Sequence, residues 1–159
     1  MGYIYNMPHT RNHRNKGYHS ITAKRNSKHT FAKFQKEITV TFLETIILIK
    51  LFHWKTFSYS THKATDELYG SLNENMDKFV EVLLGKSGER TNLMNKKTIS
   101  LIDVNSPDKF KERMFAFKRY LVALNHNNAI KQMTNSDLLN IRDEILGDVN
   151  KLLYLLTFK

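Results

Sequence analysis

Cysteine is absent from this chain of 159 residues, and glycine and proline are scarce, with six and two copies. Without cysteine the protein has no disulfides, no thiolate metal ligands and no cysteine nucleophile. So few glycines and prolines leave too few tight turns for an all-β fold. No apolar stretch is long enough to span a bilayer and no secretory signal is visible, so we expect no membrane partner. These absences favour an all-helical domain.

Acidic residues are missing from residues 1–36, which contain eight lysines and arginines. Because the whole chain has a net charge of +10, the later residues together contribute only +2. Residues 1–29 also lack apolar periodicity, and such a segment cannot bury enough surface to offset its ordering entropy. We therefore expect a flexible, disordered basic arm at residues 1–29 and a folded domain at residues 30–159.

The cations of this arm suit the phosphates of a nucleic acid, and its tyrosines are available to stack on bases. Nothing in the arm resembles a recognition helix, so we expect binding that is not sequence-specific. A solubilising tail, a docking arm for an acidic protein and a mitochondrial presequence are the alternatives, and the last lacks an amphipathic apolar face. The predicted nucleic-acid contacts are Arg11, Arg14, Lys16, Lys24, Arg25 and Lys28.

Apolar residues recur every three or four positions in four stretches, which is the period of an amphipathic helix. Two glycines, Gly85 and Gly88, are expected to end the second helix. Between the second and third helices lies a long connection, with room for a short helix within it. This order predicts a four-helix bundle with a long crossover. The expected helices span residues 31–56, 60–84, 106–125 and 134–159.

Helix-start signals locate the last two helices. Ser106 is a suitable N-cap, and Pro107 fits the first turn. Thr134 is followed three residues later by Asp137, which resembles a capping box. We therefore expect the third helix to begin at Ser106 and the fourth near Thr134.

Five residues of metal-ligand type lie between residues 53 and 81. Imidazole nitrogen and carboxylate oxygen together suit iron, with zinc or manganese as alternatives. A single histidine or aspartate on a helix is more often solvated or hydrogen-bonded, so it is the set that indicates a metal site. Its members are His53, His62, Asp66, Asp77 and Glu81.

Four of the five lie on the second predicted helix. His62 and Asp66 are four residues apart, as are Asp77 and Glu81, so each pair shares a helix face. At about 100° per residue all four fall within an arc of roughly 100°. The pairs are roughly 16 Å apart along the axis, too far for one ion to contact both. Either the pairs are unrelated, or an antiparallel second copy of the helix completes two equivalent sites.

The pattern resembles the Dps family, or miniferritins, of the ferritin-like superfamily. The resemblance rests on His53-Trp54, on the order and spacing of the other four ligand-type residues, and on the string from Asp66 to Tyr69. It implies a ferritin-like four-helix bundle that assembles as a two-fold dimer and a dodecamer. It also implies an iron site between subunits, with His53, His62 and Asp66 from one chain and Asp77 and Glu81 from the other. We expect Trp54, beside the site, to pack in the core or at an interface.

From this resemblance we expect a ferroxidase and iron-storage subunit, which oxidises Fe(II) with hydrogen peroxide or oxygen and binds or protects DNA through its arm. It would lie in the cytoplasm or with the nucleoid. The alternative is a non-enzymatic structural protein that packages DNA or accompanies it in a particle. A third possibility, an oxygenase- or catalase-like di-metal bundle, would carry Glu-x-x-His motifs on two helices, and the sequence contains none.

Overall fold

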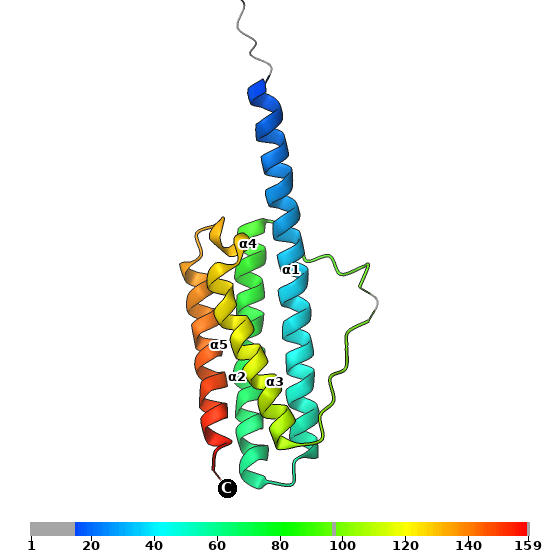
Figure 1. Ribbon diagram of the computed structural model, residues 1–159, viewed down its shortest axis with the longest axis vertical. Helices are drawn as coiled ribbons and strands as arrows, with labels where there is room; N and C mark the ends of the chain where they lie inside the picture. Colours follow the sequence, from blue (N-terminus) through cyan, green and yellow to red (C-terminus); the bar gives the residue numbers. More distant parts are fainter. Residues whose placement is uncertain (1–14, 97, 159) are drawn as a thin grey trace, which may run out of the picture.

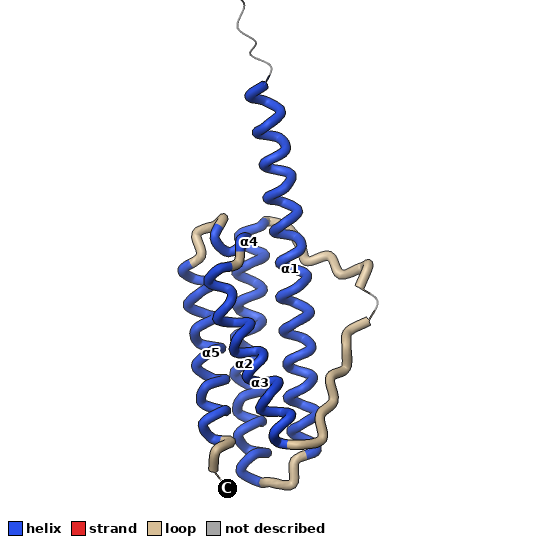
Figure 2. The backbone as a smooth tube through the Cα atoms, viewed as in Figure 1, coloured by secondary structure: helices blue, strands red, loops and turns tan. Residues whose placement is uncertain are grey.

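The computed structural model describes residues 15–96 and 98–158, with side chains from residue 28 onward. Four long helices make up the described chain, with two short helical turns before the last, and the described residues contain no strand (Figure 2). The predicted all-helical class is therefore confirmed. The elements are α1 (Asn15–Lys55), α2 (Tyr59–Ser87), α3 (Pro107–Ala123), η1 (Leu124–His126), α4 (Asn128–Lys131) and α5 (Ser136–Leu155).

The long helices lie side by side, and α2 contacts both α1 and α5, while α3 packs on α5. In Figure 1, α1 and α5 run downward, and α2 and α3 run upward. Residues 88–96 and 98–106 belong to the connection from the end of α2 to the start of α3, and they contain no helix. The short helix expected within this connection is therefore absent from its described residues.

The core is built from the apolar stripes that the sequence predicted. Phe42 of α1 makes edge-to-face contacts with Phe79 of α2 and Phe117 of α3, with ring centroids 5.5 and 6.3 Å apart. Phe52 stacks on Phe110 at 4.0 Å and so joins the lower ends of α1 and α3. Each such side chain contributes roughly 1.5–3 kcal/mol on burial. The α5 stripe is buried as well, at Leu138, Ile141, Ile145, Val149, Leu152 and Leu156.

Some helix ends agree with the sequence signals, whereas the end of α2 and the starts of α5 and α1 differ from them. Ser106 caps α3 as expected, accepting a hydrogen bond from the backbone nitrogen of Lys109. Helix α2 continues through Gly85 and ends at Gly88, whose φ of 67° lies in the left-handed region that glycine tolerates best. Helix α5 begins at Ser136, with Asn135 as N-cap and no side-chain cap hydrogen bond, so the capping box expected from Thr134 and Asp137 does not form. The Thr134 carbonyl and the Asp137 carboxylate both bind the Lys86 ammonium instead.

Helix α1 begins at Asn15, well before the expected start at residue 31. Once the packed part of α1 has formed, adding residues at its end requires only helix propagation and no new nucleus. Residues 15–30 contain no proline, so nothing removes a backbone donor from this extension. Residues 15–29 of the expected flexible arm are therefore helical, and they project beyond the bundle in Figure 1. The rest of the arm, including Arg11 and Arg14, lies outside the described residues.

Candidate metal centre

The candidate metal centre lies at the turn between α1 and α2. His53 is in the last turn of α1, and His62 is in the first turn of α2. Only residues 56–58 separate the two helices, and Ser58 caps α2 by accepting a hydrogen bond from the Thr61 backbone nitrogen. This tight connection stacks the two imidazole rings, with centroids 3.9 Å apart and an interplanar angle of 24°.

Each histidine is fixed by the backbone of the other. His53 Nδ1 lies 3.1 Å from the His62 carbonyl oxygen, and His62 Nδ1 lies 3.1 Å from the His53 carbonyl oxygen. A carbonyl oxygen only accepts hydrogen bonds, so both Nδ1 atoms carry the proton and donate. In the neutral rings Nε2 is therefore the atom with the lone pair. Histidine ligands of metals are commonly oriented in this way, through a hydrogen bond from the other ring nitrogen.

Asp66 supplies a carboxylate next to the buried imidazole. Its Oδ1 lies 3.9 Å from His53 Nε2, and the Asp66 side chain is 55% exposed whereas that of His53 is 8% exposed. Two metal–ligand bonds of about 2 Å each would span such a gap. A protonated His53 would instead form an ion pair with the carboxylate at this distance. These two side chains are thus close enough for one cation to lie between them, but they supply only two ligands.

The stacking of the rings limits what one chain provides. A bound metal lies close to the plane of the imidazole that binds it, so two nearly parallel rings cannot both direct Nε2 at one ion. Accordingly, no three His, Cys, Asp or Glu side chains within the described residues form a potential metal-binding group. Of the three ligands expected from one chain, His53 and Asp66 face each other, and His62 requires a ring rotation to join them.

The second predicted pair, Asp77 and Glu81, lies farther along α2, and both side chains are exposed. Because α2 is continuous from Tyr59 to Ser87, Asp77 stays roughly 16 Å along the axis from Asp66, the nearer member of the first pair. Asp77 borders a groove of about 210 Å³ between α1 and α2, which Leu43 and Ile46 also line. Within one chain the two predicted pairs are therefore not brought together.

Trp54 is not part of the core, contrary to one of the two placements expected for it. Its side chain is 68% exposed, and the Lys50 ammonium lies 5.9 Å from its ring centroid and 4.3 Å from that of Tyr69. These cation–π contacts join α1 and α2 on the side away from α5. We call this surface the outer α1–α2 face, and define it by Leu43, Ile46, Lys50, Trp54, Tyr69, Asn73, Asp77 and Val80.

The basic residues predicted to contact nucleic acid lie at the opposite end of α1. Lys16, Lys24 and Arg25 fall on its helical extension, where only the backbone is described. The Lys28 ammonium pairs with Glu89 at 2.6 Å, and this hydrogen bond, together with the negative charge of Glu89, raises the pKa of Lys28. Glu89 lies just after α2 and is therefore distant in sequence from Lys28, so the sequence alone did not indicate that it neutralises this lysine of α1.

Three contacts within the candidate metal centre were also missed. Thr65 is fully buried, and its Oγ1 lies 3.2 Å from His53 Nδ1. The mutual carbonyl hydrogen bonds of His53 and His62 were not expected either. The sequence signal that could have indicated these hydrogen bonds is a pair of histidines nine residues apart, one on each side of the turn between two helices.

Fold and site together define a helical protein with a candidate metal centre at one end and a basic helix at the other. The chain belongs to DUF5856, a family of unknown function that matches residues 53–156. No curated protein and no solved structure matches the chain. No helix in the described part of the chain is long and apolar enough to cross a membrane.

This family assignment shows that the resemblance to the Dps family, and with it ferritin-like membership, is wrong. The matched region begins at His53 and includes every ligand-type residue on which the resemblance rested. Residues four apart share the face of any helix, and an eleven-residue interval returns to nearly the same face. A polar helix face can therefore show this spacing without common ancestry.

Proposed function

We propose that the protein binds iron at a site shared between two chains and oxidises Fe(II). The main support is that both imidazoles are fixed through Nδ1, which leaves Nε2 of His53 toward the Asp66 carboxylate. Nitrogen and carboxylate oxygen suit iron, and zinc or manganese could bind the same atoms. The C-terminal end of α1 adds a partial negative charge beside His53, which favours a cation there.

A second copy of the chain would supply the missing ligands. The outer α1–α2 face presents exposed apolar side chains, including Leu43 and Trp54, and an antiparallel two-fold pairing would cover them. The same pairing would direct Asp77 and Glu81 of one chain toward His53 and Asp66 of the other. Two carboxylates would then balance the higher charge of Fe(III). A two-fold arrangement of this kind gives two equivalent sites per dimer.

In the proposed reaction Fe(II) is a substrate. Two Fe(II) ions each lose one electron, and one hydrogen peroxide takes up both electrons with two protons to give two waters. Oxygen is the alternative oxidant. In this proposal the chain binds and orients the ions, and the oxidant accepts the electrons. Storage of the Fe(III) product and assembly beyond the dimer, up to a dodecamer, are further parts of the proposal.

Mixed dimers test both the site and its sharing between chains. One variant carries His53→Asn and Asp66→Asn, and the other carries Asp77→Asn and Glu81→Gln. Each variant alone should oxidise Fe(II) at the background rate, whereas co-folded chains should recover about a quarter of the sites. The matched control is Glu74→Gln, which changes an exposed acid on the same helix.

The results separate the alternatives. Full activity of the Asp77/Glu81 variant alone would show that one chain is sufficient and would refute sharing. Wild-type protein that binds no iron in a calorimetric titration would refute the metal site altogether. In that case the non-enzymatic structural function, which needs only the bundle and the basic helix, is the remaining proposal.

A second candidate function is binding of nucleic acid without sequence preference. It is favoured by the helical extension of α1, which projects beyond the bundle and carries Lys16, Lys24 and Arg25 without an acid (Figure 1). Cations on such a helix displace counterions from phosphates, so affinity should fall steeply with salt. Packaging or protection of DNA, with location in the cytoplasm or nucleoid or in a DNA-containing particle, would follow from this activity.

Neutralising part of this helix tests the second function. Lys24→Gln with Arg25→Gln should weaken binding of a labelled duplex and reduce the slope of log affinity against log salt. The matched control is Lys63→Gln with Lys109→Gln, which removes two exposed cations elsewhere. Equal losses in the two double variants would show that net charge alone drives binding, and would refute a role specific to α1.

A further inference from the structure

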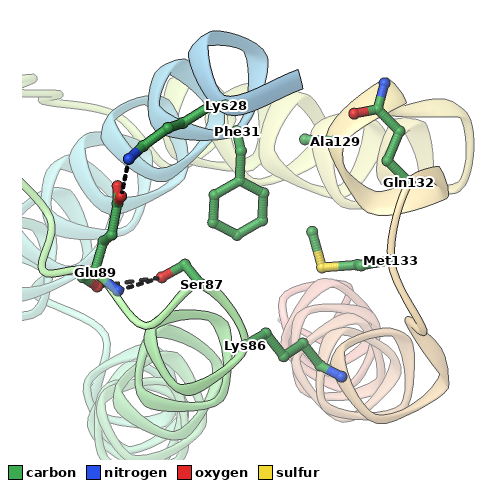
Figure 3. Close-up of a pocket in the computed structure, with 8 residues that line it drawn as sticks. All are labelled: Lys28, Phe31, Lys86, Ser87, Glu89, Ala129, Gln132 and Met133. Carbon is green, nitrogen blue, oxygen red and sulfur yellow. Dashed lines mark hydrogen bonds and ion pairs between the residues drawn. The ribbon is translucent and has the colours of Figure 1, made fainter. Parts of the chain in front are cut away.

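A cavity of about 470 Å³ lies where α1 leaves the bundle, between α1, the end of α2 and the segment around α4 (Figure 3). Pockets of 300–1,000 Å³ are typical of small-molecule sites in proteins. The cavity is at the other end of α1 from His53, so it is separate from the candidate metal centre. The described residues that line it are Lys28, Phe31, Lys86, Ser87, Glu89, Ala129, Gln132 and Met133.

Inside the cavity, the aromatic ring of Phe31 faces the thioether of Met133. Phe31 is half-buried and points its ring from α1 into the space, and Met133 points in from the opposite wall (Figure 3). Ala129, which is fully buried, adds a small apolar surface. A flat π-system fits between such walls, because an aromatic face stacks well and methionine adapts to irregular shapes.

The charged groups around the cavity are already paired. Lys28 binds Glu89 at 2.6 Å, and Lys86 binds Asp137 and the Thr134 carbonyl, each at 2.8 Å. Both acids near the cavity are thus neutralised by lysines. The adjoining residues 15–27 of α1 contain basic residues and no acid. An anionic chain can therefore approach along α1 without strong repulsion at the cavity.

We infer that this cavity holds one unstacked base of a single-stranded nucleic acid whose phosphates follow the basic part of α1. The inference rests on the second candidate function. Proteins that bind single strands without sequence preference combine a cationic track with aromatic platforms, because every base has a π-face. Here the track and the platform are consecutive parts of one helix. A base in a duplex cannot enter unless it leaves the stack, so this contact distinguishes single strands from duplexes.

Phe31 variants test the stacking contact in the full-length protein. Phe31→Leu keeps an apolar side chain against the core but removes the π-face, and it should weaken binding of labelled oligo(dT) roughly tenfold. Phe31→Tyr keeps the aromatic face and should bind oligo(dT) about as tightly as the wild-type protein. Affinity for a duplex of equal length should not change in either variant. Phe57→Leu is the matched control, because Phe57 is a fully exposed phenylalanine at the other end of α1.

The results distinguish the failure of this inference from failure of nucleic-acid binding itself. If Lys24→Gln with Arg25→Gln weakens binding but Phe31→Leu leaves oligo(dT) affinity unchanged, the base pocket is refuted and the basic helix stands. If the wild-type protein binds no oligonucleotide, both proposals fail. If Phe31→Leu weakens single-strand and duplex binding equally, Phe31 acts through the position of α1 and the cavity does not take a base.

Discussion

Arg142 of α5 donates a hydrogen bond from Nη1 to the backbone carbonyl of Leu121, 2.8 Å away in the last turn of α3. Its Nη2 donates to Asn125 Oδ1 at 2.9 Å, and its Nε pairs with Asp143. The residue is 5% exposed, so its charge is removed from most solvent. The guanidinium thus gives the Leu121 carbonyl a charged donor in addition to the Leu124 backbone nitrogen, and it fixes the end of α3 against α5.

Arg142→Met should therefore destabilise the protein by about 3 kcal/mol. Methionine keeps much of the side-chain volume but leaves the Leu121 carbonyl buried without its charged donor. Urea denaturation followed by circular dichroism measures the effect. Arg119→Met on the exposed side of α3 is the control and should change stability by less than about 0.5 kcal/mol. Equal stability of the two variants would contradict this role of Arg142.

Thr65→Val should weaken metal binding about tenfold, because partners that orient a histidine ligand tune its affinity. Thr65 Oγ1 contacts His53 Nδ1 and also donates to the Thr61 carbonyl. Thr45→Val is a close control, because the buried Thr45 hydroxyl donates to the Thr41 carbonyl four residues back. Calorimetric titration with Fe(II) should separate the two variants, and similar affinities would exclude an orienting role for Thr65.

Asp137 should make stability depend on pH in the acid range. The hydrogen bond from Lys86 lowers the pKa of Asp137 from its ordinary 3.8, so the folded protein favours the carboxylate. This stabilisation is present above pH 3.8 and is lost as the pH falls through the lower pKa of the folded state. Asp137→Asn should thus be less stable than wild type near pH 7, and the difference should shrink as the pH falls below 3.8.

The control for this pH effect is Asp108→Asn, which changes an exposed acid at the start of α3. Thermal unfolding across pH values should show a smaller pH-dependent difference for it, since none of the lysine side chains that the structure describes is bonded to Asp108. A difference between wild type and Asp137→Asn that stays constant as the pH falls well below 3.8 would assign the effect to side-chain shape instead of charge.

Two glycines of α2 should respond in opposite directions to alanine. Gly88 has a φ of 67°, which a side chain disfavours, so Gly88→Ala should destabilise the protein by about 1 kcal/mol. Gly85 lies within the helix with open space around it, so Gly85→Ala should stabilise by about 0.5–1 kcal/mol. Chemical denaturation of both variants gives the sign of each stability change. A stabilising effect of Gly88→Ala would contradict the left-handed backbone conformation of Gly88 at the end of α2.

The sequence predicted most of the core because burial follows helical periodicity. The stripes from Phe34 to Phe52 and from Leu138 to Leu156 are buried as expected. The start of α1 was missed because periodicity detects packing, and residues 15–29 form helix beyond the packed part. The contacts of the Lys86 ammonium with Thr134 and Asp137 at the start of α5 could not be read from local sequence, because Lys86 lies 48 residues before Thr134.

The sequence predicted which helices carry the candidate ligand residues but only part of their geometry. Spacing along α2 correctly separated Asp66 from Asp77. It could not indicate that the turn would stack His53 on His62, because that contact depends on where both helices end. The family resemblance failed since ligand spacing on one helix face contains little information about ancestry.

The length of α1 has a consequence for any two-fold assembly. Its 41 residues extend roughly 60 Å, from the basic extension to the turn that holds His53. In an antiparallel dimer the two extensions would point in opposite directions. If the extensions bind nucleic acid as proposed, such a dimer would have two binding sites and could connect two separate strands or duplexes. Compaction of long DNA would then require dimers, whereas a monomer would only coat the DNA.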